Sequence, residues 1–284
     1  MESIVICGKG KITIDTLAIC KKTLANYRVI YCYLEKEQTG INCVDFAKNA
    51  GFDCFEIKNY ESLASFIKEI NPVYILLFQF SMVIKEDLIL FAKNKIINLH
   101  HANLPYFRGV GPITQAILSG SNKFGVTLHF VDSQIDTGNI ILQKNFPIKN
   151  KTNEQVFNEC LHFDREIISK LLNKIAGNKK IKSKIQDDSK ATYYSKDKLN
   201  YDNPFIDFNN TANQIFLFCL AYTFPSQNLF PKYNYKQKIY TFMDIPIIGE
   251  RCPNFKRGTL IEEDKFIRIS SSDRWLIFKS FILE

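Results

Sequence analysis

The sequence predicts an α/β fold followed by a smaller β-rich domain, and two observations lead to this expectation. Up to residue 99, short apolar runs alternate with amphipathic stretches, which is typical of βα units on a parallel sheet. From residue 237 onward, short strand-like runs follow one another with turn residues between them, as in a small β-barrel or sandwich. We place the boundary near residue 190, so the predicted domains are 1–190 and 191–284.

In the first half of the chain, each expected strand is an apolar run and each expected helix has a helical period. The strands are expected at 3–7, 28–33, 53–56, 73–78 and 96–99, and the helices at 14–26, 41–50, 60–69 and 85–93. Ligands of open α/β sheets bind at the carboxyl ends of the strands. The loops after Phe78 and Leu99 are therefore the first places to search for a site.

The second half begins with two further strand candidates, Gly125–Val131 and Asn139–Pro147, which flank a loop with acidic and glycine residues. A long amphipathic helix is expected at 153–176, and the polar, lysine-rich stretch 177–190 after it is typical of a linker. The carboxy-terminal elements follow the linker and comprise a helix at 210–221 and strands at 237–243, 258–262, 265–270 and 274–279.

Composition indicates a globular protein, with 284 residues, 46% of them hydrophobic, and 37 basic against 29 acidic side chains. The longest apolar stretch, Phe216–Phe224, is shorter than the roughly 20 residues that a membrane helix needs. The amino terminus carries no secretory signal, so we expect no membrane association and a cytoplasmic location. The net charge of +8 favours anionic partners.

Eight cysteines are spread along the chain without a close pair, and the spacings typical of zinc ligands are missing. We therefore expect reduced thiols and no metal site. Gly8-Lys9-Gly10 follows a strand as in dinucleotide-binding proteins, but Thr13 stands where the third glycine of that fingerprint belongs. We interpret this segment as a tight turn rather than as a nicotinamide or flavin site.

The stretch Ile97–Gly111 (INLHHANLPYFRGVG) carries the strongest chemical signal. By strand alternation, Asn98 and His100 project to the same side at the carboxyl end of a strand. The proline and glycine pairs after His101 predict a fixed loop rather than a helix. With Asp136 from the later acidic loop, a neutral His can accept a proton, an Asn can donate to an oxyanion and an Asp can orient the His. Asn, His and Asp near turns are also common local hydrogen-bonding residues, so spacing alone leaves both interpretations open.

These pieces resemble the 10-formyltetrahydrofolate-dependent formyltransferases. The motif comprises Asn98-Leu99-His100, Asn103-Leu104-Pro105, Phe107-Arg108-Gly109, Gly125-Val126-Thr127-Leu128-His129 and Asp136-Thr137-Gly138. Ala191-Thr192-Tyr193-Tyr194 extends the likeness into the second domain. The resemblance implies a Rossmann-like catalytic domain up to residue 190 and a β-rich domain similar to the oligonucleotide-binding (OB) fold.

The resemblance also implies a role for each matching residue. His100 would accept the proton of an attacking amine, Asn98 would stabilise the oxyanion, and Asp136 would hold His100 and assist proton passage to the departing folate nitrogen. The pterin ring would lie against Asp132 and the loop after residue 78, which comprises Gln79, Phe80, Ser81, Met82 and Val83. Phe80 could equally be core and Asp132 a solvated turn residue. His101 departs from the small residue that related sequences often have there.

Three branches of the family compete for this chain. The glycinamide ribonucleotide branch usually ends near the first domain, whereas this sequence continues. The methionyl-tRNA branch carries a basic insertion after the second strand, whereas Tyr33–Val44 is short and nearly neutral. We favour the branch that formylates amino sugars on nucleoside diphosphates, here a dTDP-linked 3- or 4-amino-dideoxyhexose for surface polysaccharides. Methionyl-tRNA formyltransferase is the alternative.

A diphosphate acceptor suits the basic character of the chain, and four side chains are candidate phosphate contacts: Lys9, Arg108, Lys196 and Lys198. Each could instead be a solvated surface charge. The lysine cluster at 179–184 could bind nucleic acid, but we interpret it as a solvated linker. A pure binding module would leave the spacing of Asn98, His100 and Asp136 unexplained. We expect a homodimer from the resemblance.

Overall fold

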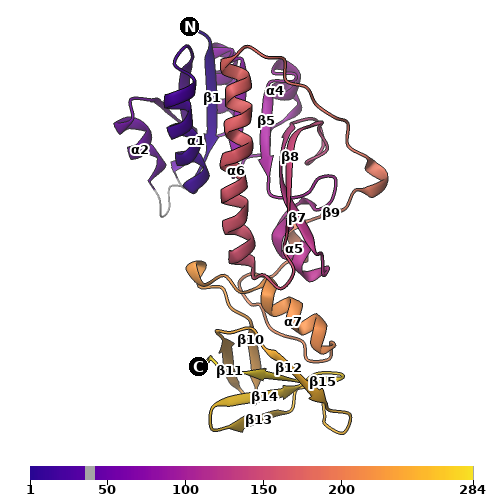
Figure 1. The fold of residues 1–284 in the computed structure, drawn as a ribbon. Coiled ribbons are helices and arrows are strands. Elements are labelled where there is room, and N and C mark those ends of the chain that lie inside the picture. The colour runs from indigo at the N-terminus through magenta and orange to yellow at the C-terminus, as the bar shows by residue number, and fades with distance from the viewer. Residues whose placement is uncertain (36–41, 284) are drawn as a thin grey trace. The chain divides into compact units, whose positions relative to one another are not determined.

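The computed structural model describes residues 1–35 and 42–283, and its centre is a seven-stranded sheet of order β3-β2-β1-β4-β5-β7-β8 (Figure 1). Its strands are β1 (Ser3–Gly8), β2 (Arg28–Tyr33), β3 (Asp53–Glu56), β4 (Tyr74–Phe78), β5 (Ile96–His100), β7 (Lys123–Phe130) and β8 (Ile140–Pro147). The pairs among β1 to β5 are parallel, and β7 runs antiparallel to β5. The predicted α/β class with a largely parallel sheet is confirmed.

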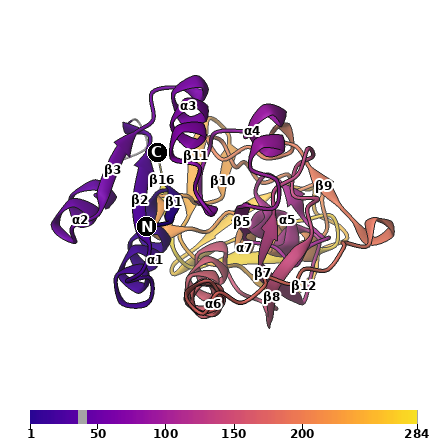
Figure 2. The same cartoon turned by 90° about the horizontal axis from the view of Figure 1, so that it is seen from above.

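Helices cover both faces of this sheet. They are α1 (Gly10–Thr23), α2 (Cys43–Asn49), α3 (Tyr60–Ile70), α4 (Glu86–Phe91) and α6 (Asn153–Ala176). Seen from above, α3 and α4 lie over one face and α1 and α6 over the other (Figure 2). Apolar side chains of α3 and α4 form one buried cluster with alternate residues of β1, β2 and β4, which fixes the inward-facing sides of those strands.

Helix α1 begins at Gly10 rather than at the expected residue 14, directly after a turn that needs small residues. A Cβ atom on Gly8 would lie 2.2 Å from the Phe78 carbonyl oxygen, and Gly10 has a φ of +72°. Glycine, which has no Cβ atom, is therefore required at positions 8 and 10. Gly8 thus lets the end of β1 approach the end of β4.

The loop expected after His101 ends in a short helix that the sequence interpretation missed, α5 (Pro112–Leu118). Pro112 stands at the start of this helix, where a backbone N–H is not needed, and Gly111 before it has a φ of +64°. The prediction of broken regular structure at Gly111-Pro112 was therefore wrong from Pro112 onward.

The stretch 177–190, expected to be a linker, is tied to the sheet in two places. Lys184 exchanges two backbone hydrogen bonds of 2.8 Å each with Ile140 at the start of β8. Two residues further, Gln186 is buried. The interpretation of 177–190 as a linker was therefore wrong at residues 184–186, while Lys179, Lys180, Lys182 and Lys184 of the cluster 179–184 are exposed.

The carboxy-terminal region is antiparallel and β-rich, as predicted. Its sheets have the orders β10-β11-β16 and β12-β15-β14-β13, and a separate two-stranded pair joins β6 and β9. The elements are β6 (Arg108–Gly109), β9 (Tyr193–Tyr194), α7 (Ala212–Ala221), β10 (Lys232–Tyr235), β11 (Lys238–Phe242), β12 (Ile247–Arg251), β13 (Leu260–Glu263), β14 (Phe266–Ser270), β15 (Arg274–Phe278) and β16 (Phe281–Leu283). Strands β6, β9, β10, β12 and β16 were not expected.

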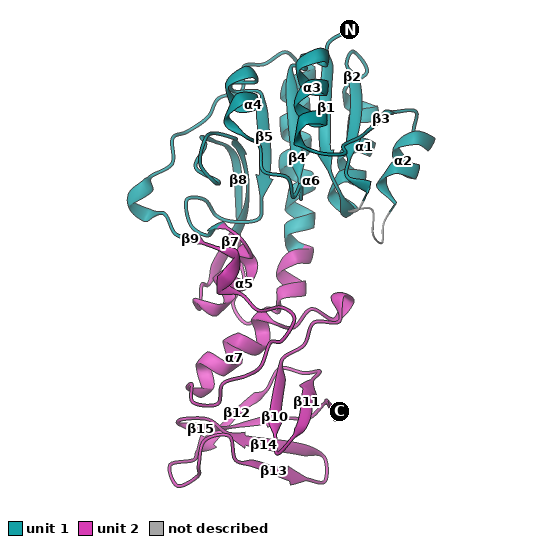
Figure 3. Ribbon diagram, turned by 180° about the vertical axis from the view of Figure 1, so that it is seen from behind, with its two compact units in different colours: residues 1–108, 125–145, 159–193 teal, residues 109–124, 146–158, 194–284 magenta. Residues whose placement is uncertain are grey.

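Two compact units divide the chain (Figure 3). Unit 1 comprises 1–108, 125–145 and 159–193, and unit 2 comprises 109–124, 146–158 and 194–284. The last change of unit falls between Tyr193 and Tyr194, and both units are discontinuous in sequence, unlike the contiguous domains 1–190 and 191–284 that we predicted.

Membrane and thiol features were also part of the sequence interpretation. Among the described residues, no helix has the length and apolar character needed to cross a bilayer. All eight cysteines lie in the described part and are free thiols. The segment Tyr33–Val44, which lacks a basic insertion in the sequence, contains residues 36–41, and these lie outside the described residues.

Candidate functional site

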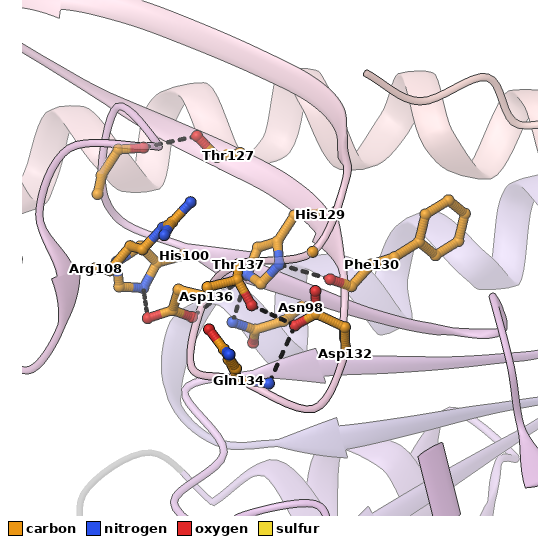
Figure 4. A network of polar contacts seen from close by, with 12 residues as sticks. Asn98, His100, Arg108, Thr127, His129, Phe130, Asp132, Gln134, Asp136 and Thr137 are labelled. Atoms are coloured by element: carbon orange, nitrogen blue, oxygen red, sulfur yellow. Dashed lines mark hydrogen bonds and ion pairs between the residues drawn. The ribbon is translucent and has the colours of Figure 1, made fainter. Parts of the chain in front are cut away.

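The carboxyl end of β5 presents polar side chains to both faces of the sheet. Asn98 and His100 lie two residues apart on one side, and His101 follows on the other, where it contacts α6. Alternation of side chains along a strand accounts for this division. The predicted juxtaposition of Asn98, His100 and Asp136 is present in unit 1 (Figure 4).

His100 is held by a backbone carbonyl. Its Nε2 atom lies 2.9 Å from the Phe107 oxygen, and the side chain is buried. A carbonyl oxygen only accepts hydrogen bonds, so Nε2 carries the hydrogen and donates it to Phe107. The lone pair of the neutral ring is therefore on Nδ1, which makes Nδ1 the proton acceptor.

Asp136 faces that acceptor atom. Its Oδ2 lies 3.6 Å from His100 Nδ1, and its Oδ1 lies 3.5 Å from His129 Nε2. Burial lowers the pKa of His100 below its ordinary value of 6.5, while the nearby Asp136 carboxylate acts in the opposite direction. The ring is therefore neutral near pH 7, and a proton arriving at Nδ1 meets a carboxylate that stabilises it.

Asn98 is oriented by a second histidine, which the sequence interpretation did not single out. Asn98 and His129 are cross-strand neighbours on β5 and β7, and Asn98 Nδ2 lies 3.2 Å from His129 Nε2. His129 Nδ1 lies 2.8 Å from the Phe130 carbonyl oxygen, so it donates there and Nε2 accepts from Asn98. The amide of Asn98 thus has a defined direction, with a second N–H left for an oxyanion. Pairing the expected strands 96–99 and 125–131 in antiparallel register would have placed His129 opposite Asn98 and so identified it.

The turn that carries Asp136 is tightly closed. Asp132 accepts hydrogen bonds from the Thr137 hydroxyl and the Gln134 backbone N–H, so its observed partners are those of a turn residue. A Cβ atom on Gly138 would lie 1.8 Å from the Phe130 carbonyl oxygen. Glycine is required there because the turn passes directly against β7.

The loop predicted to hold the pterin ring follows β4 at the same edge of the sheet. Phe78, the last residue of β4, pairs with Leu99 in β5, which places Gln79 beside the end of the strand that carries His100. Phe80 and Met82 are partly buried against the core cluster, whereas Ser81 and Val83 are exposed. Phe80 therefore contributes to packing as well as lining the loop.

The four predicted phosphate contacts lie in different surroundings. Lys9 precedes α1 at the carboxyl end of β1. Arg108 is buried and donates to Gln186 and Asp188, so contact with a phosphate would require this pairing to open. Lys196 and Lys198 belong to unit 2, whereas Asn98, His100 and Asp136 belong to unit 1.

Gln186 is the second residue that the sequence interpretation passed over. It is buried beside the Asp136 turn, and its amide donates to the Asp136 and Gly138 carbonyls. Nothing in the sequence indicated this burial, because the charged residues around Gln186 are typical of a solvent-exposed segment.

His101 forms a buried ion pair on the opposite face of the sheet. Its Nε2 lies 2.8 Å from Asp164 Oδ2, and the Asp164 side chain is 1% exposed. Burial raises the pKa of Asp164, and His101 counteracts that shift. In the described part of the chain, Asp164 Oδ1 accepts no hydrogen bond. His101 is therefore the group on which this carboxylate depends.

No group of three or more His, Cys, Asp or Glu side chains among residues 1–35 and 42–283 is arranged to hold a metal ion. The side chains of the site offer a neutral imidazole, an adjacent carboxylate and an oriented amide donor. These groups suit the transfer of an acyl group to a nucleophile that must lose a proton.

Comparison with known proteins agrees with this chemistry. Residues 8–172 match a family model described as formyl transferase. A methionyl-tRNA formyltransferase of Clostridium tetani is 26% identical over 231 residues, which are 79% of this chain and 71% of that protein. A second, from Caldanaerobacter subterraneus subsp. tengcongensis, is 30% identical over 138 residues, or 48% of this chain and 44% of the relative. The chain thus spans about half the length of several curated relatives.

Solved structures share the fold over nearly the whole chain. The N-formyltransferase from Helicobacter canadensis, in complex with folinic acid and dTDP-3-aminofucose, has a TM-score of 0.78 and 22% identity over 99% of this chain and 100% of its own. WlaRD, a sugar 3N-formyl transferase in the presence of dTDP and 5-N-formyl-THF, has a TM-score of 0.77 and 22% identity over 99% and 98%. Both likenesses establish the fold.

The His101–Asp164 pair generates the first prediction. His101→Leu strands the buried Asp164 carboxylate, and we expect it to lower the free energy of unfolding by about 3 kcal/mol in urea titrations. Adding Asp164→Leu removes the stranded charge and restores most of this loss. His162→Leu, at an exposed position of α6, is the matched control. A His101→Leu protein as stable as wild type would contradict the assignment.

Proposed function

Because residues 8–172, more than half of the chain, match its family model, the chain belongs to the formyl transferase family, and on that premise we propose that it transfers a formyl group from 10-formyltetrahydrofolate to a primary amine. The observation that carries the proposal is the surroundings of His100, with Nδ1 available as a base and 3.6 Å from Asp136. A base, a carboxylate and an amide donor at one edge of a sheet are the parts that this transfer needs.

The residues divide the work of the transfer between them. The folate co-substrate supplies the formyl group. His100 Nδ1 takes the proton that the amine loses as its nitrogen bonds to the formyl carbon, and Asp136 stabilises the resulting imidazolium. Asn98 donates to the formyl oxygen as negative charge develops on it. The proton held at His100 then passes to the folate nitrogen as its bond to the formyl carbon breaks.

The folate side of the site is proposed at Gln79, Phe80, Ser81, Met82 and Val83, with Asp132 on the neighbouring turn. The loop residues 79–83 follow β4 at the carboxyl edge of the sheet, where ligands of such folds bind. Lys9 stands at the same edge, just before a helix N-terminus that carries no acidic residue in its first turn. An amino-terminal helix end attracts phosphate, so Lys9 is our first candidate for the acceptor diphosphate.

We propose a nucleotide-linked amino sugar as the acceptor, in the form of a dTDP-linked 3- or 4-amino-dideoxyhexose that feeds surface polysaccharides. The support is that solved structures similar over 99% of this chain include a protein bound to dTDP-3-aminofucose. The proposal includes a cytoplasmic homodimer with a catalytic domain at 1–190 and an OB-like domain at 191–284. Lys196 and Lys198 stay predicted contacts of the diphosphate, whereas Arg108 could contact it only if its pairing with Gln186 and Asp188 opened.

Methionyl-tRNA is the second candidate acceptor, because curated relatives of that name match up to 79% of this chain. An assay of the purified protein with 10-formyltetrahydrofolate separates the two. We expect formylation of dTDP-linked 3-amino or 4-amino sugars and none of glycinamide ribonucleotide or charged initiator tRNA. Formylation of the tRNA alone would overturn the sugar assignment.

Substitutions in the trio should reduce turnover rather than binding. We expect His100→Ala to lower kcat at least about a hundredfold, because the general base is gone, while folate still binds in an equilibrium titration. Asn98→Ala should also lower kcat with a nearly unchanged KM, since its contact forms in the transition state. His162→Ala is the control on an exposed histidine. Normal turnover in His100→Ala would exclude the base assignment.

The buried base also predicts the pH dependence of the reaction. Burial lowers the pKa of His100 below 6.5, so the neutral base persists to lower pH and the acid limb of kcat/KM should lie below pH 6.5. An unfolded chain binds this proton first as pH falls, so the folded state loses stability below about pH 6.5. Asp136→Asn removes the carboxylate that acts to raise this pKa, and should move the limb of the residual activity further down. An acid limb above pH 7 would contradict the geometry.

A further inference from the structure

Gln186 stands apart from the other polar side chains of its segment, because it is 7% exposed in a stretch of mostly solvated residues. Its amide makes four hydrogen bonds. Nε2 donates to the Asp136 carbonyl at 2.8 Å and to the Gly138 carbonyl at 2.7 Å. Oε1 accepts from Arg108 Nε at 3.2 Å and Nη2 at 2.8 Å. Both hydrogens and both lone pairs of the amide are therefore used.

These four hydrogen bonds, which we call the Gln186 brace, join two chain segments that both contact His100. On one side, Asp136 places its carboxylate beside Nδ1 of the imidazole. On the other side, Arg108 directly follows Phe107, whose carbonyl accepts the Nε2 hydrogen of His100. One glutamine amide thus connects the two chain segments that contact the two ring nitrogens of the base.

The Asp136 turn has particular need of such a brace. Asp136 has a φ of +57°, an unfavourable region for a residue with a side chain. Residues 132–135 before it are exposed, so they supply little packing. Gln186 donates to the carbonyls of Asp136 and Gly138, the residues on either side of Thr137. These two hydrogen bonds fix the backbone at Asp136 and therefore the direction of its carboxylate.

We propose that Gln186 is a positioning residue that, with Arg108, fixes the Asp136 carboxylate against His100. The expected loss of kcat rests on the proposed function, whereas the position of Asp136 against His100 does not depend on it. Gln186 touches neither of the reacting partners through its own amide, because the amide is fully used within the protein. It acts through Asp136.

Two substitutions test the brace from different directions. Gln186→Met keeps the length of the side chain and removes all four hydrogen bonds. Gln186→Glu keeps acceptors for Arg108 but turns carboxylate oxygens toward the Asp136 and Gly138 carbonyls, which repels the turn. Gln134→Met is the matched control, since Gln134 is an exposed residue of the same loop.

Steady-state kinetics over pH 5–9 give the first readout. We expect both Gln186 variants to lose about tenfold or more in kcat, with the KM values for folate and acceptor changed less than about twofold, because the reacting groups are misplaced. The acid limb should move to lower pH as Asp136 withdraws from His100. The charged or titratable groups that influence His100 are Asp136, His129 and His101. In these variants His101 keeps Asp164, and His129 keeps Asn98 and the Phe130 carbonyl but also loses contact with Asp136.

Histidine-labelled NMR titration gives a readout that does not need the reaction. The chain has four histidines, and we expect the resonance of His100 to titrate at lower pH in Gln186→Met and Gln186→Glu than in wild type and Gln134→Met. An unmoved His100 titration in a folded variant overturns the proposal, including where kcat falls together with thermal stability. If Gln186→Met does not fold, Gln186→Glu decides. Wild-type protein that formylates no acceptor, with the titration shift intact, refutes the proposed function and leaves the positioning role standing.

Discussion

The hydrogen bond from His100 Nε2 to the Phe107 carbonyl decides which ring nitrogen of His100 can accept a proton. A backbone carbonyl has no hydrogen to donate, so the bond assigns Nε2 as the donor and leaves Nδ1 as the base. Everything that acts on the reacting proton must then lie on the Nδ1 side, where Asp136 is found. Phe107 holds this carbonyl in place with a φ of +60° and a backbone N–H bonded to the Thr192 hydroxyl.

The same physical device recurs at His129, where the Phe130 carbonyl accepts from Nδ1 and so makes Nε2 an acceptor for the Asn98 amide. Two main-chain oxygens therefore set which nitrogen of each imidazole accepts a hydrogen: Nδ1 of His100, and Nε2 of His129, which orients the Asn98 amide. The antiparallel register of β5 and β7 makes this possible, since it places residues 98 and 129 opposite each other.

Periodicity predicted the strands of the parallel sheet because each is a short apolar run, and the fit is close for β2 (Arg28–Tyr33), which matches the expected range. The trio was found through the order of its motif pieces, while spacing alone left it open. What the sequence hid has physical causes. Pro112 looked like a breaker but occupies a helix start, and Gln186 is surrounded by charges that are solvated while it is not. A single buried amide in a polar segment leaves no periodic pattern, so its function appears only when its partners are known.

His100 and His101 show how one strand end can be constrained from both faces of a sheet. His100 has a neutral ring that can accept a proton. His101 faces the Asp164 carboxylate, which is 1% exposed; His101 contacts its Oδ2 atom, and its Oδ1 atom has no hydrogen-bond partner among the described residues. A buried carboxylate without a partner is strongly unfavourable, so the His101–Asp164 contact holds residue 101 against α6 with more force than a solvated pair would. Because residue 101 adjoins residue 100, that contact also anchors the chain next to His100. His101 therefore anchors the chain beside His100 without placing a further group on the face of the sheet that carries His100.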